Sequence, residues 1–242
     1  MLATDGSAVV RAEGKVPGSA PGALTVDVQG LDLHDLYALL QRDLKRLLAY
    51  STVENVGVIF IGLGLALAFR ANGMGLAAGL SMTAALLHAL NHALFKSLLF
   101  LATGSVLHAT HERSLGKLGG LIRRMPWVAT LALVGTLSLA GLPPLTGFVS
   151  EWLLLQAFLS TPSIPHAFIN MIVPLGAAVV ALTAALAGYV MVKFYGVIFL
   201  GQPREPSLMQ AHDAGWLERV GLAWLALGCI LIGVFPQVAL DA

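Results

Sequence analysis

Charged residues are scarce in this sequence: Asp, Glu, Lys and Arg make up 11% of its 242 residues, whereas 57% are hydrophobic. Soluble domains carry about 25% charged residues. This scarcity, with a mean hydropathy of +0.81, excludes a water-soluble surface for most of the chain and predicts an all-α integral membrane protein whose main partner is the lipid bilayer. The net charge of +1 gives no sign of a nucleic-acid partner.

Cysteine is almost absent. The single cysteine, Cys229, lies in an apolar run, so a disulfide framework or a metal–thiolate site within the chain is excluded. The sequence also has no CxxC, HExxH, GxGxxG or Walker motif. We therefore expect no metal and no cofactor. If the protein serves a redox process, the electrons move through another polypeptide, and this chain has no catalytic redox site of its own.

Residues 1–35 are rich in Gly, Ala and Pro and have no sustained period. We expect a disordered or atypical N-terminal segment there, followed by a transmembrane domain over residues 36–242. A helix needs about 20 apolar residues to cross the hydrocarbon core. Apolar runs of that length predict about five membrane-spanning helices, at residues 47–69, 76–107, 127–158, 169–200 and 220–240.

The third run is interrupted by Gly141, Pro143, Pro144 and Gly147. Two prolines remove two backbone donors and clash with the preceding turn, so the helix must break. The segment is either a hairpin of two short crossings or one crossing by a broken helix. Broken helices near the midplane recur in ion and proton transporters, where unwound backbone lines the pathway. The competing interpretation is a proline kink that only helps the helices to pack and has no role in transport.

The positive-inside rule distinguishes these topologies, because cytoplasmic loops carry an excess of Lys and Arg. With one crossing, a single side holds almost every basic loop residue, and the other holds Arg70. The residues on the basic side are Arg42, Lys45, Arg46, Arg113, Lys117, Arg123, Arg124, Arg204 and Arg219. A hairpin would spoil the asymmetry. The pattern therefore favours one discontinuous crossing in the inner (plasma) membrane, with the loops Arg42–Arg46 and Arg113–Arg124 cytoplasmic.

Ionisable residues lie deep in the second span. His88, His92 and Lys96 are spaced at i, i+4 and i+8, which stacks them on one helix face beside Asn91. A charge at the bilayer centre costs at least ~2.5 kcal/mol, so three such groups indicate a polar path rather than a lipid-facing stripe. Histidine titrates near neutrality, which suits proton relay. A zinc site on His88 and His92 is disfavoured because no carboxylate or thiol joins them and the ammonium repels cations.

Two carboxylates complete the set. Glu151 follows the break, at the start of the second half-helix, where a helix N-terminus also favours negative charge on local grounds. Its depth beside the unwound loop favours a proton-carrying role. Glu54, in the first span, is a weaker candidate, because it could simply hydrogen-bond to Asn55 or to a basic residue at the membrane surface.

Four stretches carry a resemblance: RDLKRLLAYSTVENVG at 42–57, HALNHALFK at 88–96, GGLIRRMP at 119–126 and GLPPLTGFVSEW at 141–152. They resemble the antiporter-like membrane subunits shared by respiratory complex I (the NADH–quinone oxidoreductase), membrane-bound hydrogenases and Mrp-type cation/proton antiporters. The residues of these motifs are most similar to those of the branch that contains hydrogenase-4 component B and formate hydrogenlyase subunit 3.

The resemblance implies a helical bundle of two inverted repeats, each with a broken helix. It implies that Lys96 is the central lysine, that His88 and His92 lie on a hydrated path, and that Glu151 links the path to the outer face. The partners it implies are other membrane-arm subunits and a peripheral hydrogenase or dehydrogenase arm. A complete member would have the first repeat before Asp43, so we expect the C-terminal portion of such a protein, from a truncated gene or a mispredicted start.

The sequence is therefore compatible with three functions. The first is a proton-translocating membrane subunit of a hydrogenase, formate hydrogenlyase or NADH–quinone oxidoreductase-like complex. The second is a subunit of an Mrp-type Na⁺/H⁺ antiporter. The third is a truncated remnant that packs in the membrane without transporting.

Overall fold

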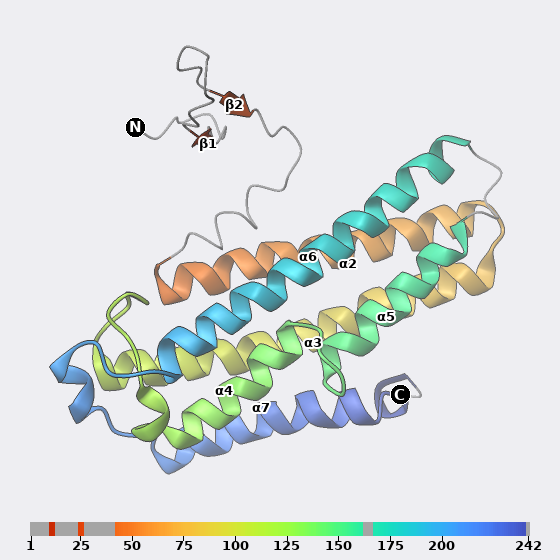
Figure 1. Cartoon of the computed structure of the whole chain (residues 1–242). Coiled ribbons are helices and arrows are strands. Elements are labelled where there is room, and N and C mark those ends of the chain that lie inside the picture. The colour runs from red at the N-terminus through yellow and green to blue at the C-terminus, as the bar shows by residue number, and fades with distance from the viewer. Residues whose placement is uncertain (1–9, 13–23, 27–41, 162–166, 241–242) are drawn as a thin grey trace.

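The computed structural model describes residues 10–12, 24–26, 42–161 and 167–240 (Figure 1). In that part of the chain, long helices lie side by side and two short 3-10 helices occur in the loops. The helices are α2 (Leu44–Ala71), α3 (Gly75–Thr110), η1 (Leu121–Arg123), α4 (Pro126–Leu139), α5 (Thr146–Leu159), α6 (Ala167–Phe199), η3 (Pro206–Gln210), α7 (Trp216–Val234) and α8 (Gln237–Leu240).

The N-terminal segment contributes two three-residue strands, β1 (Val10–Ala12) and β2 (Leu24–Val26), which pair antiparallel with Val10 opposite Val26. The rest of residues 1–35 lies outside the described residues, so the prediction made for that segment stays a prediction.

Four of the described helices are long and apolar enough to cross a membrane: α2, α3, α6 and α7. Helices α4 and α5 have 14 residues each. At 1.5 Å per residue, each is about 21 Å long, too short for a hydrocarbon core of about 30 Å. Figure 1 shows α4 and α5 following one another across the bundle in the same direction. Together they make one discontinuous crossing, and the all-α membrane fold expected from the sequence is confirmed.

Backbone contacts between loops show that the basic segments share one end of the bundle. Leu44 donates its N–H to the Arg113 carbonyl at 3.1 Å, and Leu115 donates to the Arg42 carbonyl at 2.7 Å. The N–H of Gly120 reaches the carbonyl of Leu200 at 2.9 Å. Residues 42–46, 111–125 and 200–215 therefore meet at the same end, at the left of Figure 1, as one broken crossing requires. A hairpin would have sent residues 200–215 to the other end.

A carboxylate organises the loop after α3. Glu112 Oε1 accepts the backbone N–H groups of Arg113 at 2.9 Å and Ser114 at 2.8 Å, and its Oε2 pairs with Lys117 at 3.2 Å. The Ser114 N–H above all, and then the Lys117 ammonium, hold the pKa of the Glu112 carboxyl below its usual range.

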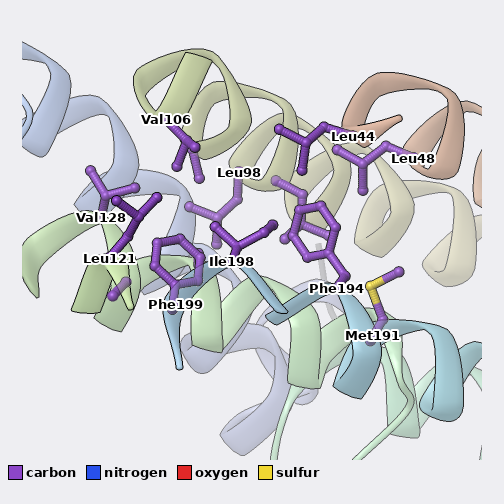
Figure 2. Close-up of a cluster of buried hydrophobic side chains, with 14 of the residues drawn as sticks. Leu44, Leu48, Leu98, Val106, Leu121, Val128, Met191, Phe194, Ile198 and Phe199 are labelled. Atoms are coloured by element: carbon purple, nitrogen blue, oxygen red, sulfur yellow. The ribbon is translucent and has the colours of Figure 1, made fainter. Parts of the chain in front are cut away.

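Helix α3 occupies the middle of the bundle and packs against α2, α4, α5 and α7. The larger hydrophobic core lies toward the basic end and combines side chains from α2, α3, η1, α4 and α6 (Figure 2). Leu48, Leu98 and Phe194 are each no more than 2% exposed there. This packing fixes α3 against its neighbours, so the polar groups of the same helix have defined partners.

The break between α4 and α5 depends on two glycines. Gly141 has φ = +63°, a left-handed conformation that disfavours a side chain. A Cβ on Gly147 would overlap the Ser138 carbonyl oxygen, so only glycine lets α5 start this close to the end of α4. The Pro143–Pro144 peptide bond is cis. All four residues predicted to interrupt the helix thus lie in or beside the break.

Candidate functional site

One face of α3 carries polar side chains that are withdrawn from the surface. His88 is 2% exposed, Asn91 0% and Lys96 5%. They are directed at α2 and α5, the two helices that supply their hydrogen-bond partners. Buried polar groups are costly unless they are hydrogen-bonded, so the partners of each group decide what this face can do.

The Lys96 ammonium is bound by α2. Its Nζ donates to the Leu48 carbonyl oxygen at 2.7 Å and to the Ser51 hydroxyl oxygen. Glu54, one turn further along α2, is near enough for its charge to act on the ammonium. The cation is therefore held by oxygen atoms of one helix, and its closest partners are neutral.

The His88 ring bridges α2 and α5. Its Nε2 lies 3.1 Å from Asn55 Oδ1, and its Nδ1 lies 2.9 Å from Ser150 Oγ. Because both ring nitrogens are engaged, a metal ion shared with His92 would have to displace one of these contacts. Among the described residues, no group of three or more His, Cys, Asp and Glu is gathered in the way that a metal site needs.

Asn91 attaches α3 to the first turn of α5. Its Nδ2 donates to the Thr146 carbonyl at 2.7 Å and to Ser150 Oγ at 3.0 Å, while its Oδ1 accepts from the Thr146 hydroxyl. The broken helix is therefore held against α3 at the point where it resumes.

These contacts join seven side chains into what we call the buried polar network. Its members are Ser51, Asn55, His88, Asn91, Lys96, Thr146 and Ser150. Asn55 closes the connection on α2, because its Nδ2 donates to the Ser51 carbonyl at 2.7 Å. Hydroxyl and imidazole groups both donate and accept, so the contact between Ser150 and His88 can reverse its direction when a proton arrives or leaves, whereas the amide groups of Asn55 and Asn91 keep theirs.

His92, predicted to share the stripe, has a different environment. Its side chain is half-buried, its ring packs edge-on against Phe95 with centroids 5.6 Å apart, and its Nε2 has no hydrogen-bond partner among the described residues. The predicted trio is thus not one continuous chain of contacts: His88 and Lys96 connect through α2, and His92 lies between them in sequence but outside the network.

Glu151 lies on another side of α5. Its half-buried carboxylate sits against Gly141, where an added Cβ would fall 2.5 Å from Oε2. Glu151 also lines a cavity between α2, α5 and α6, together with Glu54, Asn55 and Thr183. Asn55 therefore belongs both to the network and to the wall of this cavity, which brings the two predicted carboxylates and His88 into one region.

Four members of the network were not predicted from the sequence as functional residues: Ser51, Asn55, Thr146 and Ser150. A partial signal is present, since Ser51 and Asn55 on α2, and Thr146 and Ser150 on α5, are spaced at i and i+4 in apolar helices. That spacing puts both members of each pair on one helix face.

Comparison of the sequence with known families shows which proteins this chain resembles. The sequence profile of the family described as NADH:quinone oxidoreductase/Mrp antiporter, transmembrane, matches residues 24–176. Formate hydrogenlyase subunit 3 of Escherichia coli is 41% identical over 213 residues, which cover 88% of this chain and 34% of that protein. Hydrogenase-4 component B of Escherichia coli is 39% identical over 199 residues, covering 82% of this chain and 30% of that protein.

A solved structure of a membrane complex also contains a chain with this fold. A chain in the membrane-bound sulfane sulfur reductase, an archaeal respiratory membrane complex, matches with a TM-score of 0.70 and 32% identity, over 85% of this chain and 30% of that one. This chain spans about a third of the length of the curated relatives it matches.

Proposed function

The chain belongs to the NADH:quinone oxidoreductase/Mrp antiporter family of transmembrane proteins, and on that premise we propose that it carries protons through the membrane as a subunit of a redox-driven complex. The complex is of the hydrogenase, formate hydrogenlyase or NADH–quinone oxidoreductase type. The resemblance that the sequence motifs predicted is confirmed by the family match and by the two hydrogenase-type relatives.

The observation that carries the proposal is the buried polar network. It links the Lys96 ammonium to the His88 imidazole by way of α2, and links His88 to the first turn of α5 by way of Ser150. Polar groups inside a membrane protein are expensive and mark ion or proton paths. A bundle that needed only packing would not enclose a lysine and a histidine at 5% and 2% exposure.

Each ionisable residue then has a role. Lys96 holds a proton among neutral oxygen atoms, and His88 takes up and releases one on the side of its ring that faces α5. His92 takes part from outside the network, where its half-buried ring packs against Phe95. Glu151 passes protons to and from the cavity beside the broken helix, with Glu54 as an auxiliary carboxylate on the same cavity wall. The break at Gly141, Pro143, Pro144 and Gly147 supplies the unwound backbone that such a path requires.

The environment follows from the same proposal. The chain crosses the inner membrane with its basic end, including Arg42–Arg46 and Arg113–Arg124, in the cytoplasm. Its partners are further membrane-arm subunits and a peripheral hydrogenase or dehydrogenase arm, which supplies the redox energy. The chain itself binds no redox cofactor.

Cation/proton antiport is the second candidate. The family description includes the Mrp antiporter, and Glu54, Glu151 and Thr183, whose side chains carry oxygen atoms, line one cavity. Oxygen ligands suit hard cations, so Na⁺ could compete with H⁺ there.

Affinity purification through a tag on this chain, from its native membranes, separates the two candidates. A redox complex predicts co-purifying hydrogenase or dehydrogenase subunits, whereas an antiporter predicts only membrane subunits. The purified complex is then placed in liposomes with a pH-sensitive dye inside. Redox-driven acidification that does not require Na⁺ supports the first candidate, and Na⁺-dependent exchange without an electron donor supports the second.

The variant Glu151→Gln tests the assigned path in the same liposomes. Glutamine keeps the size of the side chain but cannot carry a proton, so we expect transport to fall at least about tenfold while the complex still assembles. Normal transport by Glu151→Gln would contradict the path. Absence of transport by the wild-type complex under both conditions would favour a non-transporting remnant.

A further inference from the structure

Ser150 has three hydrogen-bond contacts but only one proton to donate. Its Oγ lies 2.9 Å from His88 Nδ1, 3.0 Å from Asn91 Nδ2 and 3.0 Å from the Gly147 carbonyl oxygen. An amide NH₂ group can only donate, and a carbonyl can only accept. The Ser150 proton therefore points either at Gly147 or at His88, and the choice sets the direction of the contact with the imidazole.

The other side of the His88 ring is fixed by Asn55. The Asn55 Nδ2 lies 2.7 Å from the Ser51 carbonyl oxygen, which has no proton to give. The amide nitrogen must therefore face Ser51, and the amide oxygen faces His88 Nε2 at 3.1 Å. Because that oxygen only accepts, Nε2 carries a proton, and the basic lone pair of neutral His88 is on Nδ1.

From this geometry we propose that every proton that His88 binds or releases passes through the Ser150 hydroxyl group. A ring nitrogen makes one in-plane hydrogen bond, and the one at Nδ1 is taken by Ser150 Oγ. The inference deepens the proposed function and rests on it, because the path supplies the proton. It makes Ser150, which was not predicted from the sequence, a relay residue.

The transfer balances as follows. In the neutral state, the Ser150 O–H donates to His88 Nδ1. A hydrated proton from the path binds to Ser150 Oγ while the original hydroxyl proton moves to Nδ1. The hydroxyl again has one proton, and the imidazole has gained one. The new O–H then donates to the Gly147 carbonyl, and Nδ1–H donates to Oγ. Release follows the same steps in reverse.

Both states satisfy the buried groups. Ser150 is 1% exposed and His88 2%, so an unpaired donor or acceptor on either would be costly. In the neutral state, Oγ accepts from Asn91 and donates to His88. In the protonated state, Oγ accepts from both and donates to Gly147. Rotation of a single hydroxyl group therefore suffices to accommodate the imidazolium ion without moving a helix.

The first test compares proton transport by the reconstituted complex carrying Ser150→Ala, Ser150→Thr or Ser81→Ala. Ser81 is a matched control, because its hydroxyl is also buried in a span but donates only to the Ala77 carbonyl of its own helix. We expect at least a tenfold loss with Ser150→Ala, and transport within about twofold of wild type with Ser150→Thr, which keeps a hydroxyl, and with Ser81→Ala.

The second test does not depend on transport. The purified full chain in lipid nanodiscs is labelled with ¹⁵N-histidine, and the His88 signals are assigned as those that a His88→Asn variant lacks. At alkaline pH we expect Ser150→Ala to shift the signal of the unprotonated Nδ1 and to leave the Nε2–H signal in place. An unchanged Nδ1 signal would overturn the contact, and with it the relay, even if Ser150→Thr proves unable to assemble.

A Lys96→Ala complex, measured alongside, separates the two levels of the proposal. If Ser150→Ala transports normally while Lys96→Ala does not, the relay is wrong and the proton path stands. If both transport normally, the proposed function itself is wrong.

Discussion

Replacing Asn55 with Leu tests the hydrogen-bond assignment around His88. In the wild type, the Asn55 amide oxygen faces Nε2 at 3.1 Å, so the neutral ring must carry its proton on Nε2. The opposite tautomer would set two lone pairs against each other. Leucine is close to asparagine in size but offers no acceptor. The substitution therefore removes the one contact that selects the Nε2–H tautomer in the described part of the bundle.

The magnitude follows from counting hydrogen bonds. In the Leu variant, both tautomers leave Nε2 without a partner. The Nδ1–H tautomer makes one more bond, because Ser150 then accepts from His88 and donates to the Gly147 carbonyl, 3.0 Å away. One net hydrogen bond contributes about 1 kcal/mol, which corresponds to a ratio of about fivefold. The dominant tautomer should therefore change from Nε2–H to Nδ1–H.

The assay is ¹⁵N NMR of histidine-labelled protein in nanodiscs at alkaline pH, where the two tautomers give different nitrogen shifts. Ser81→Ala is the control, because the Ser81 hydroxyl bonds only to its own helix and its loss should leave Nε2–H in place. A wild-type ring with its proton on Nδ1, or an Asn55→Leu ring that keeps Nε2–H, would refute the assignment and remove the basis for proton exchange at Nδ1.

Three further predictions concern the frame that holds the site. Gly147→Ala should lower the free energy of unfolding by about 2 kcal/mol or more, because the added Cβ overlaps a backbone carbonyl, and should lower the melting temperature in detergent by several degrees. Gly64→Ala is the control and should change neither, because nothing lies within 4 Å of its added Cβ. Glu112→Gln should lower the free energy of unfolding by less than ~1 kcal/mol at neutral pH, since its partner Lys117 is exposed to solvent. The Glu112 pKa is lowered by folding, so its contribution is complete above the unfolded pKa and fades as pH falls through the folded one; an equal difference in thermal stability at acidic pH would contradict this. In a chain that carries Cys229→Ala, single cysteines at Gln210 and Ala71 should react with a membrane-impermeant thiol reagent from opposite faces. Labelling of both from one face would reject the single broken crossing.

The architecture was largely readable from the sequence, because lipid leaves few alternatives. Apolar runs of bilayer length located the spans of the described residues, and most of their ends agree closely: the expected 169–200 is α6 at Ala167–Phe199. The fifth run differs most, because α7 ends at Val234, just before Pro236, whereas the sequence predicted a span over 220–240. The prolines and glycines located the break. The distribution of Lys and Arg decided between a hairpin and one crossing, since it reports which loops share a side of the membrane.

The site was only partly readable. Charged groups such as Lys96 and Glu151 stand out in an apolar helix, because their burial is expensive. Serine and asparagine do not, because either can satisfy itself on its own helix, as Ser81 does on the Ala77 carbonyl. Whether Ser150 faces such a carbonyl or a histidine on α3 depends on the rotation of α5 against α3, and periodicity within one helix does not encode that relation.

Proton uptake by liposomes that contain the wild-type complex or its Lys96→Met variant tests the central claim most directly. Met keeps most of the length of Lys96 but carries no proton, and the Leu48 carbonyl still accepts from the Ser51 and Thr52 hydroxyls, at 3.2 and 3.1 Å. Assembly should therefore survive. We predict that the variant assembles, keeps the electron-transfer activity of its partners and loses at least about nine-tenths of proton transport. Transport at the wild-type rate by a fully assembled Lys96→Met complex would contradict a proton path through this bundle.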